Sequence, residues 1–283
     1  VNSLALNMNE WNYDSSNDIY YQIGLPYCLV PESSSLETCG IYVPGGYFKG
    51  SKNSDGTYTC SLNSLGKVGN YSASNAPIVI PVNTPGYSEM KAPSSYSASS
   101  ISSYTKDGII YLFAGCRGKS NSASGGIGGA PWGVTDLKAA IRYYRYNGSN
   151  LPGKDVYSFG MSGGGAQSAI LGASGDSSLY SPYLEAIGAA TKDASGVSIS
   201  DAITGSMCWC PITSLDVANE SYEWNMGQFA SSGTRASSNW TKALSDDLAT
   251  SYASILNNLA LKDSSGSLLK LDTSSSGIYC SGT

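Results

Sequence analysis

The segment Val156-Tyr157-Ser158-Phe159-Gly160-Met161-Ser162-Gly163-Gly164-Gly165 decides the fold. Its first six residues have the character of a buried β-strand, and the residues after Gly163 are small and typical of a closely packed helix. A G-x-S-x-G pattern between a strand and a helix is typical of a nucleophilic serine on a sharp turn. Glycines flank such a turn because bulkier side chains would collide with the strand or the helix. We therefore predict that the Ser162 hydroxyl is exposed at the carboxyl edge of a sheet.

The same turn predicts a site that stabilises a negatively charged oxygen. The backbone N–H of Gly163 would point at the oxyanion from a helix amino terminus, where the helix dipole favours negative charge. A second donor is expected from the loop after an earlier strand, and residues 81–87 around Thr84 are the candidate. Two alternatives remain open: a tight turn that merely requires glycines, and an ordinary Asn-Thr-Pro-Gly turn at Thr84.

Short apolar runs alternate with helical patterns through the first two thirds of the chain, which predicts an α/β fold with a mostly parallel sheet. We expect one helix that is capped by Thr135 and ends at Asn147-Gly148, and a second helix that begins at Gly163. The predicted strands comprise residues 40–47, 77–82, 108–115, 156–161 and 203–210.

The pattern changes near residue 219, where a Ser-rich stretch leads into apolar residues with the spacing of one amphipathic helix, from Leu244 to Leu259. Residues 261–269 then have the pattern of a hairpin with a glycine in its turn. We therefore expect two parts, a core in residues 1–218 and the beginning of an inserted lid or cap in residues 219–283.

Composition excludes several classes of function. The 283 residues contain 16 Lys and Arg against 21 Asp and Glu, a net charge of −5, so nucleic acid is not an expected partner. No run reaches the roughly 20 apolar residues of a membrane helix, and no membrane association is expected.

The sequence contains no histidine, so the usual general base of serine catalysis is missing from it. The low lysine content and acidic balance suit a bacterial extracellular or cell-surface protein.

The seven cysteines show no C-x-x-C pair, so we expect neither a metal site nor another cofactor. Cys208 and Cys210 flank Trp209 in an apolar run and would point to the same face of a strand. We interpret both as small buried hydrophobic residues.

Several blocks of the sequence resemble bacterial tannases and the tannase-like feruloyl esterases. The resemblance runs in consistent order from about Tyr20 to Leu271 and is more specific than the serine motif alone. The blocks are residues 76–84, 114–119, 130–131, 136–143, 160–164, 166, 172–175, 210–212 and 222–224.

The resemblance implies an α/β-hydrolase fold with a lid inserted after the sixth core strand. It also implies that Ser162 is acylated by a small-molecule phenolic ester of the galloyl or feruloyl type. In that family the acid and the histidine of the triad lie beyond the lid, so here we expect them on polypeptide outside this chain. We hypothesise a bound C-terminal fragment of the same hydrolase, separated by cleavage in the lid. The alternatives are a catalytically inactive binding or interaction protein with this fold, and a serine peptidase.

Overall fold

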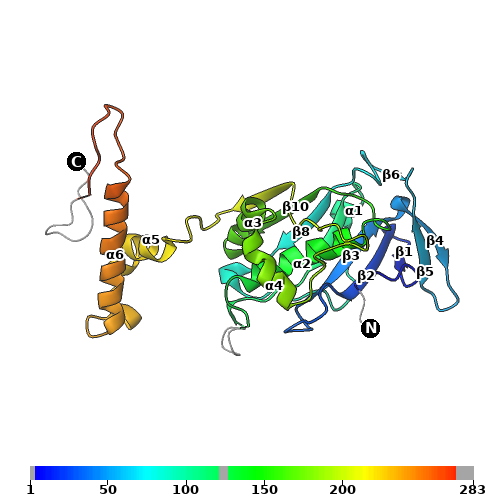
Figure 1. The fold of residues 1–283 in the computed structure, drawn as a ribbon, viewed down its shortest axis with the longest axis horizontal. Coiled ribbons are helices and arrows are strands. Elements are labelled where there is room, and N and C mark those ends of the chain that lie inside the picture. The colour runs from blue at the N-terminus through cyan, green and yellow to red at the C-terminus, as the bar shows by residue number, and fades with distance from the viewer. Residues whose placement is uncertain (1–3, 121–126, 272–283) are drawn as a thin grey trace. The chain divides into compact units, whose positions relative to one another are not determined.

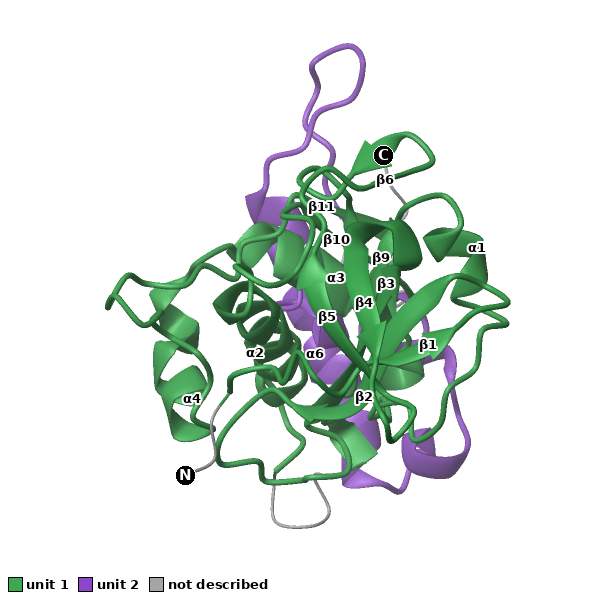
Figure 2. Cartoon of the chain, turned by 90° about the vertical axis from the view of Figure 1, so that its right-hand side faces the viewer, with its two compact units in different colours: residues 1–211 green, residues 212–283 purple. Residues whose placement is uncertain are grey.

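The computed structural model describes residues 4–120 and 127–271. The chain divides into two compact units, residues 1–211 and 212–283 (Figures 1 and 2). The division falls before the boundary expected after residue 218, because the chain leaves the first unit directly after that unit's last strand. The first unit contains β1 (Asn12–Asp14), β2 (Ile19–Pro26), β3 (Thr38–Pro44), β4 (Phe48–Lys52), β5 (Tyr58–Leu62), β6 (Lys67–Val68), β7 (Tyr71–Ser72), β8 (Ile78–Val82), α1 (Ser102–Thr105), β9 (Ile110–Ala114), α2 (Trp132–Tyr146), β10 (Val156–Met161), α3 (Gly163–Ser174), α4 (Ser181–Ala186) and β11 (Gly205–Trp209).

Seven strands form one mixed sheet in the order β1-β2-β3-β9-β8-β10-β11. Strands β9, β8, β10 and β11 are parallel to one another, whereas β1, β2, β3 and β9 pair antiparallel in succession. The expectation of a mostly parallel sheet is therefore right for only one half of it. Residues 15–18 are a short turn, which can join only antiparallel neighbours, whereas parallel strands need a long crossover.

Strand β10 begins and ends at the predicted residues, and the other predicted strands are present with ends displaced by up to three residues. β10 lies between β8 and β11, with Gly160 opposite both Val82 and Cys208. Because parallel strands end at the same edge of a sheet, the loops that follow β8 and β10 meet there. This arrangement brings Ser162 to the carboxyl edge, as the sequence predicts.

The two faces of the sheet are covered by different elements. Ile78 and Ile80 of β8 belong to the larger hydrophobic cluster, together with Leu137 of α2 and Leu171 of α3. Val79 points to the opposite face and packs in a second cluster with residues of α1. Both faces of the central strands are therefore buried, which explains why their sequences are almost continuously apolar.

Helix α2 begins at Trp132 and not at the cap expected at Thr135. The Thr135 hydroxyl donates a hydrogen bond to the carbonyl of Pro131, 3.0 Å away, and so lies inside the first turn. The predicted cap was wrong because a threonine hydroxyl can bond back to a carbonyl four residues earlier as well as cap a helix. The end of α2 before Asn147 and the start of α3 at Gly163 are as predicted.

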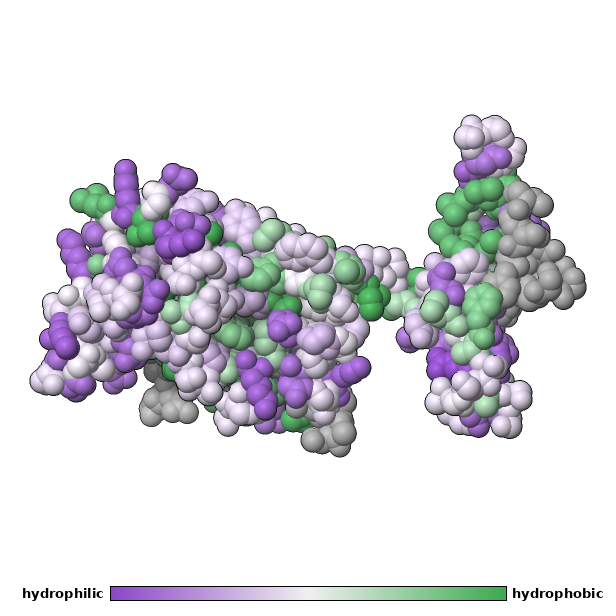
Figure 3. All heavy atoms as spheres, turned by 180° about the vertical axis from the view of Figure 1, so that it is seen from behind, coloured by the Kyte–Doolittle hydropathy of each residue, from purple (hydrophilic) through white to green (hydrophobic). Residues whose placement is uncertain are grey.

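The second unit contains α5 (Ala218–Asn225) and α6 (Trp240–Asn258), and α6 covers most of the predicted amphipathic segment. Glu223 of α5 accepts a hydrogen bond from Ser245 of α6 and forms an ion pair with Arg235. Residues 261–269 form the predicted hairpin. Hydrophobic side chains gather near the hairpin end of this unit (Figure 3), where the exposed residues include Leu259, Leu261, Leu268 and Leu269. None of the helices in the described residues has the length and apolar character that crossing a membrane requires.

Candidate active site

Ser162 occupies a strained turn between β10 and α3. Its backbone angles, φ 57° and ψ −122°, lie outside the regions that residues with a side chain favour. Two hydrogen bonds of 2.9 Å hold this conformation: the Ser162 N–H donates to the Trp209 carbonyl, and the Ser162 carbonyl accepts from the Ala166 N–H. The residue is exposed to solvent. The turn therefore presents a hydroxyl at the sheet edge, which is the placement a nucleophile requires.

The glycines around Ser162 are required by the close approach of backbone atoms. A Cβ on Gly164 would lie 2.0 Å from the Val82 carbonyl oxygen, and one on Gly163 would lie 2.5 Å from the Thr84 carbonyl oxygen. A Cβ on Gly160 would lie 2.4 Å from the Gly164 carbonyl oxygen. All three distances are below 3.0 Å, closer than a Cβ atom approaches any neighbouring heavy atom in folded proteins. Glycine therefore lets α3 pack against the end of β8.

The loop after β8 lies against the first turn of α3. Thr84 is fully buried, and its hydroxyl donates a hydrogen bond of 2.7 Å to the side-chain oxygen of Gln167 on α3. Gly163 is the first residue of α3, and the first N–H groups of a helix have no acceptor within the helix. The structure thus brings Gly163 and the Thr84 loop together. Gln167 was not predicted, although a buried polar residue on a helix of small and apolar residues is a signal for such a contact.

A buried ion cluster lies behind the carboxyl end of β9. The Arg117 guanidinium binds Asp136 through Nε at 2.9 Å and Nη2 at 2.7 Å, and lies over the ring of Trp132. Glu37 is 3.5 Å from the same guanidinium, and burial, reinforced by the Asp136 carboxylate, raises the pKa of Glu37. Both carboxylate oxygens of Asp136 therefore bind the Arg117 guanidinium.

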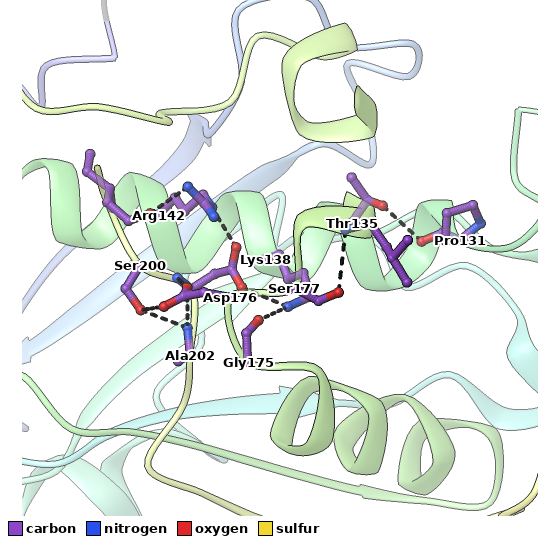
Figure 4. Close-up of polar contacts among 12 residues, drawn as sticks. Pro131, Thr135, Lys138, Arg142, Gly175, Asp176, Ser177, Ser200 and Ala202 are labelled. Carbon is purple, nitrogen blue, oxygen red and sulfur yellow. Dashed lines mark hydrogen bonds and ion pairs between the residues drawn. The ribbon is translucent and has the colours of Figure 1, made fainter. Parts of the chain in front are cut away.

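A second network, buried at Lys138 and Asp201 and exposed at Asp176, holds the carboxyl end of α3 in place (Figure 4). Lys138 donates to the C-cap carbonyl of α3 at 2.6 Å and to Asp201 at 2.7 Å, and Arg142 donates to the other Asp201 oxygen at 2.6 Å. Asp176, just after α3, accepts hydrogen bonds of 2.7 Å from the Ser200 hydroxyl and from the Asp201 N–H. The network connects α2, the carboxyl end of α3 and the segment that enters β11, at the edge of the sheet opposite Ser162.

The interpretation of Cys208 and Cys210 as buried residues was wrong. Cys210 is exposed and Cys208 is only partly buried. β11 is an edge strand of the described sheet, and it ends at Trp209, so Cys210 lies outside it with a positive φ of 42°. In the described ranges, 4–120 and 127–271, no group of three or more histidine, cysteine or acidic side chains is placed to hold a metal ion.

Solved structures of tannases match the chain over nearly its whole length. A tannin acyl hydrolase from Lactobacillus plantarum is 26% identical with a TM-score of 0.69, over 95% of this chain and 59% of that one. A Fusobacterium nucleatum tannase is 29% identical with a TM-score of 0.69, over 98% of this chain and 61% of that one. A tannin acyl hydrolase in complex with ethyl gallate is 29% identical with a TM-score of 0.66, over 90% of this chain and 54% of that one.

No protein-family model and no curated protein sequence matches the chain. The chain spans between 54% and 61% of the length of these three tannase structures. These structures nevertheless cover between 90% and 98% of this chain. The solved structures therefore confirm the resemblance to tannases that the sequence motifs indicate.

Proposed function

We propose that Ser162 is the acylated nucleophile of a hydrolase that acts on phenolic esters of the galloyl or feruloyl type. The observation that carries this proposal is the exposed Ser162 hydroxyl on a strained turn, beside the first N–H groups of α3 and the Thr84 loop. The tannase structures that resemble the chain support the ester class, since one of them is in complex with ethyl gallate. Unit 1 is then the core of an α/β-hydrolase fold, and unit 2 the beginning of its lid.

In this reaction the Ser162 oxygen attacks the ester carbonyl carbon while its proton passes to a general base. The Gly163 N–H and a donor in the Thr84 loop stabilise the negative charge on the carbonyl oxygen. The tetrahedral intermediate expels the alcohol, which takes the proton from the base, and leaves an acyl-serine. Water then attacks the acyl carbon, and the products are the phenolic acid and the free serine.

The usual general base is the part of this mechanism that the 283 residues do not supply, because none of them is histidine. The resemblance to tannases implies that its acid partner also lies beyond the lid. We place both on polypeptide outside these residues, and a bound C-terminal fragment of the same hydrolase is the proposed source. Intact-mass analysis of the native protein tests this source. A single 29.4 kDa species without a companion would contradict it.

A fluorophosphonate probe tests the role of Ser162 in the native assembly. We expect one probe per chain, bound to the peptide that contains Ser162, and no labelling of a Ser162→Ala variant. Ser206→Ala is the matched control, because Ser206 is also exposed and lies on the neighbouring strand β11. Labelling that persists in the Ser162→Ala variant would refute the role of Ser162 as the nucleophile.

The absence of histidine also supports a second candidate, a catalytically inactive protein that uses the same fold for binding. Release of nitrophenol from a nitrophenyl ester distinguishes the two candidates. The hydrolase produces a burst that equals the amount of enzyme and then a steady rate. The inactive protein produces neither.

A further inference from the structure

A cavity of about 640 Å³ lies at the opposite edge of the sheet from Ser162. Its walls include Ile78, the first residue of β8, and Gly153 and Lys154, which precede β10. The cavity is therefore at the amino ends of the parallel strands. β10 has six residues, and a rise of about 3.3 Å per residue places roughly 20 Å between the cavity and Ser162. This volume is within the usual range for small-molecule sites.

The charged residues that line the cavity are both cations, Arg145 and Lys154. Arg145 is partly buried and donates a hydrogen bond of 2.8 Å to the Ser200 carbonyl. Among the described residues, no carboxylate lies within ion-pair distance of Arg145 or Lys154, whereas Asp201 is already bound by Lys138 and Arg142. A partly desolvated guanidinium without an ion-pair partner favours an anionic ligand.

Burial, together with the nearby Arg142 charge, lowers the pKa of the Arg145 guanidinium, and the more distant carboxylates of Asp176, Asp201 and Asp155 only partly offset this. The Asp176 carboxylate accepts hydrogen bonds from Ser200 and from the Asp201 backbone, so it binds these groups and not Arg145. The positive charge of Arg145 is therefore incompletely compensated at the wall of the cavity.

The uncharged lining residues indicate which anion fits. Leu62, Ile78 and Leu151 provide an apolar wall, which suits the body of an organic molecule and not an inorganic ion. Three serines, Ser64, Ser74 and Ser200, also line the cavity. Tyr144 lines it as well, but it is only 2% exposed and its hydroxyl donates to the Pro152 carbonyl at 2.6 Å. An apolar wall interrupted by hydroxyl groups suits a ring that carries hydroxyl substituents better than a plain alkyl chain.

We propose that this cavity is a second binding site, which takes a small hydroxylated aromatic carboxylate. The carboxylate binds Arg145 and Lys154, and the ring packs against Ile78 and Leu151. The binding itself does not depend on the catalytic role of Ser162. If the proposed function holds, the acid released by ester hydrolysis belongs to this chemical class, so the cavity is a site for product.

Titration calorimetry of the native protein, with any bound fragment retained, with 4-hydroxybenzoate tests the site. We expect one molecule per chain, an affinity that falls with added salt, and weaker binding of both 4-hydroxybenzyl alcohol and octanoate. The methyl resonances of Ile78 and Leu151 should shift during the titration. Failure of 4-hydroxybenzoate to bind at millimolar concentration, or equal binding of the alcohol, would overturn the proposal.

Variants separate this site from the proposed active site. Arg145→Met should weaken binding about tenfold or more, because a charge-assisted hydrogen bond is lost. Lys154→Met, which changes an exposed residue and leaves the fold intact, should weaken it about two- to fivefold. Lys192→Met is the control for a change of charge outside the cavity, and Ser162→Ala should bind with unchanged affinity. Unchanged affinity in Lys154→Met and in a folded Arg145→Met variant would refute the site. Loss of binding in Ser162→Ala would also refute it.

Discussion

The hydrogen bond between Thr84 and Gln167 provides a quantitative test of how the candidate oxyanion loop is held. The two oxygen atoms are 2.7 Å apart, Thr84 is fully buried, and Gln167 is 7% exposed. Thr84→Val leaves the Gln167 oxygen without this donor, and Gln167→Leu leaves the Thr84 hydroxyl without its acceptor. Each change should lower the free energy of unfolding by about 1–3 kcal/mol, the usual cost of an unsatisfied buried polar group.

The double variant should cost much less than the sum of the two single variants, because replacing both partners by apolar groups of similar shape is often nearly neutral. We expect a coupling energy of about 1–3 kcal/mol from urea unfolding of the wild type, both single variants and the double variant. Thr105→Val is the matched control. Thr105 is also buried, but it bonds the Ile101 carbonyl, so its effect should add to that of Gln167→Leu. Full additivity of Thr84→Val and Gln167→Leu would refute the reasoning.

Three further predictions concern other parts of the chain. Burial raises the pKa of Asp176, but hydrogen bonds from Ser200 and the backbone outweigh burial and hold it below its ordinary value of 3.8. Asp176 is exposed, so solvent screens these interactions, and Asp176→Asn should lower the free energy of unfolding at pH 7 by only about 0.5 kcal/mol or less. Urea unfolding at several pH values should show this difference vanish as the pH falls below 3.8. Maleimide labelling followed by peptide mapping should modify Cys208 and Cys210 in the folded protein and spare the four buried thiols, Cys28, Cys39, Cys60 and Cys116. Limited digestion by an endoproteinase that cuts before aspartate should cleave first at Asp216, because residues 212–216 are exposed and lie outside any helix or strand; primary cleavage within residues 4–120 would contradict this.

The centre of the fold could be predicted from the sequence, whereas its edges could not. β10 and the start of α3 are found at the predicted residues because both are determined locally. An apolar run specifies the strand, and the glycines that follow it allow backbone atoms of neighbouring segments to approach closely. The antiparallel half of the sheet was missed because β1 has only three residues, and because the partners of β1 and β2 are set by packing across the sheet. The exposure of Cys210 depends on where β11 ends, which alternation of apolar residues does not determine.

The site shows the same division between local and long-range determinants. The motif alone predicts Ser162 and Gly163, because the strand, the turn and the helix are consecutive in sequence. Gln167 reaches Thr84 across 83 residues of sequence, and Arg117 reaches Asp136 across 19, so neither pairing follows from spacing. Such contacts can be identified only in the folded structure, where the loops that follow β8 and β9 lie beside the helices that pack against the sheet.

The strained conformation of Ser162 depends on contacts from three directions. A residue with a side chain in this region of φ and ψ costs about 1–3 kcal/mol, which the surrounding structure must offset. The Ser162 N–H is held by Trp209 of β11, and the Ser162 carbonyl is held by Ala166 of α3. The third contact is made by Gly164, which packs against the Val82 carbonyl at the end of β8. Only a residue without a Cβ can lie so near this carbonyl. A Gly164→Ala change therefore does more than remove space: it pushes α3 away from β8 and takes away one of the supports that keep the hydroxyl exposed. Stability of the turn and reactivity of Ser162 are for this reason coupled properties of the same contacts.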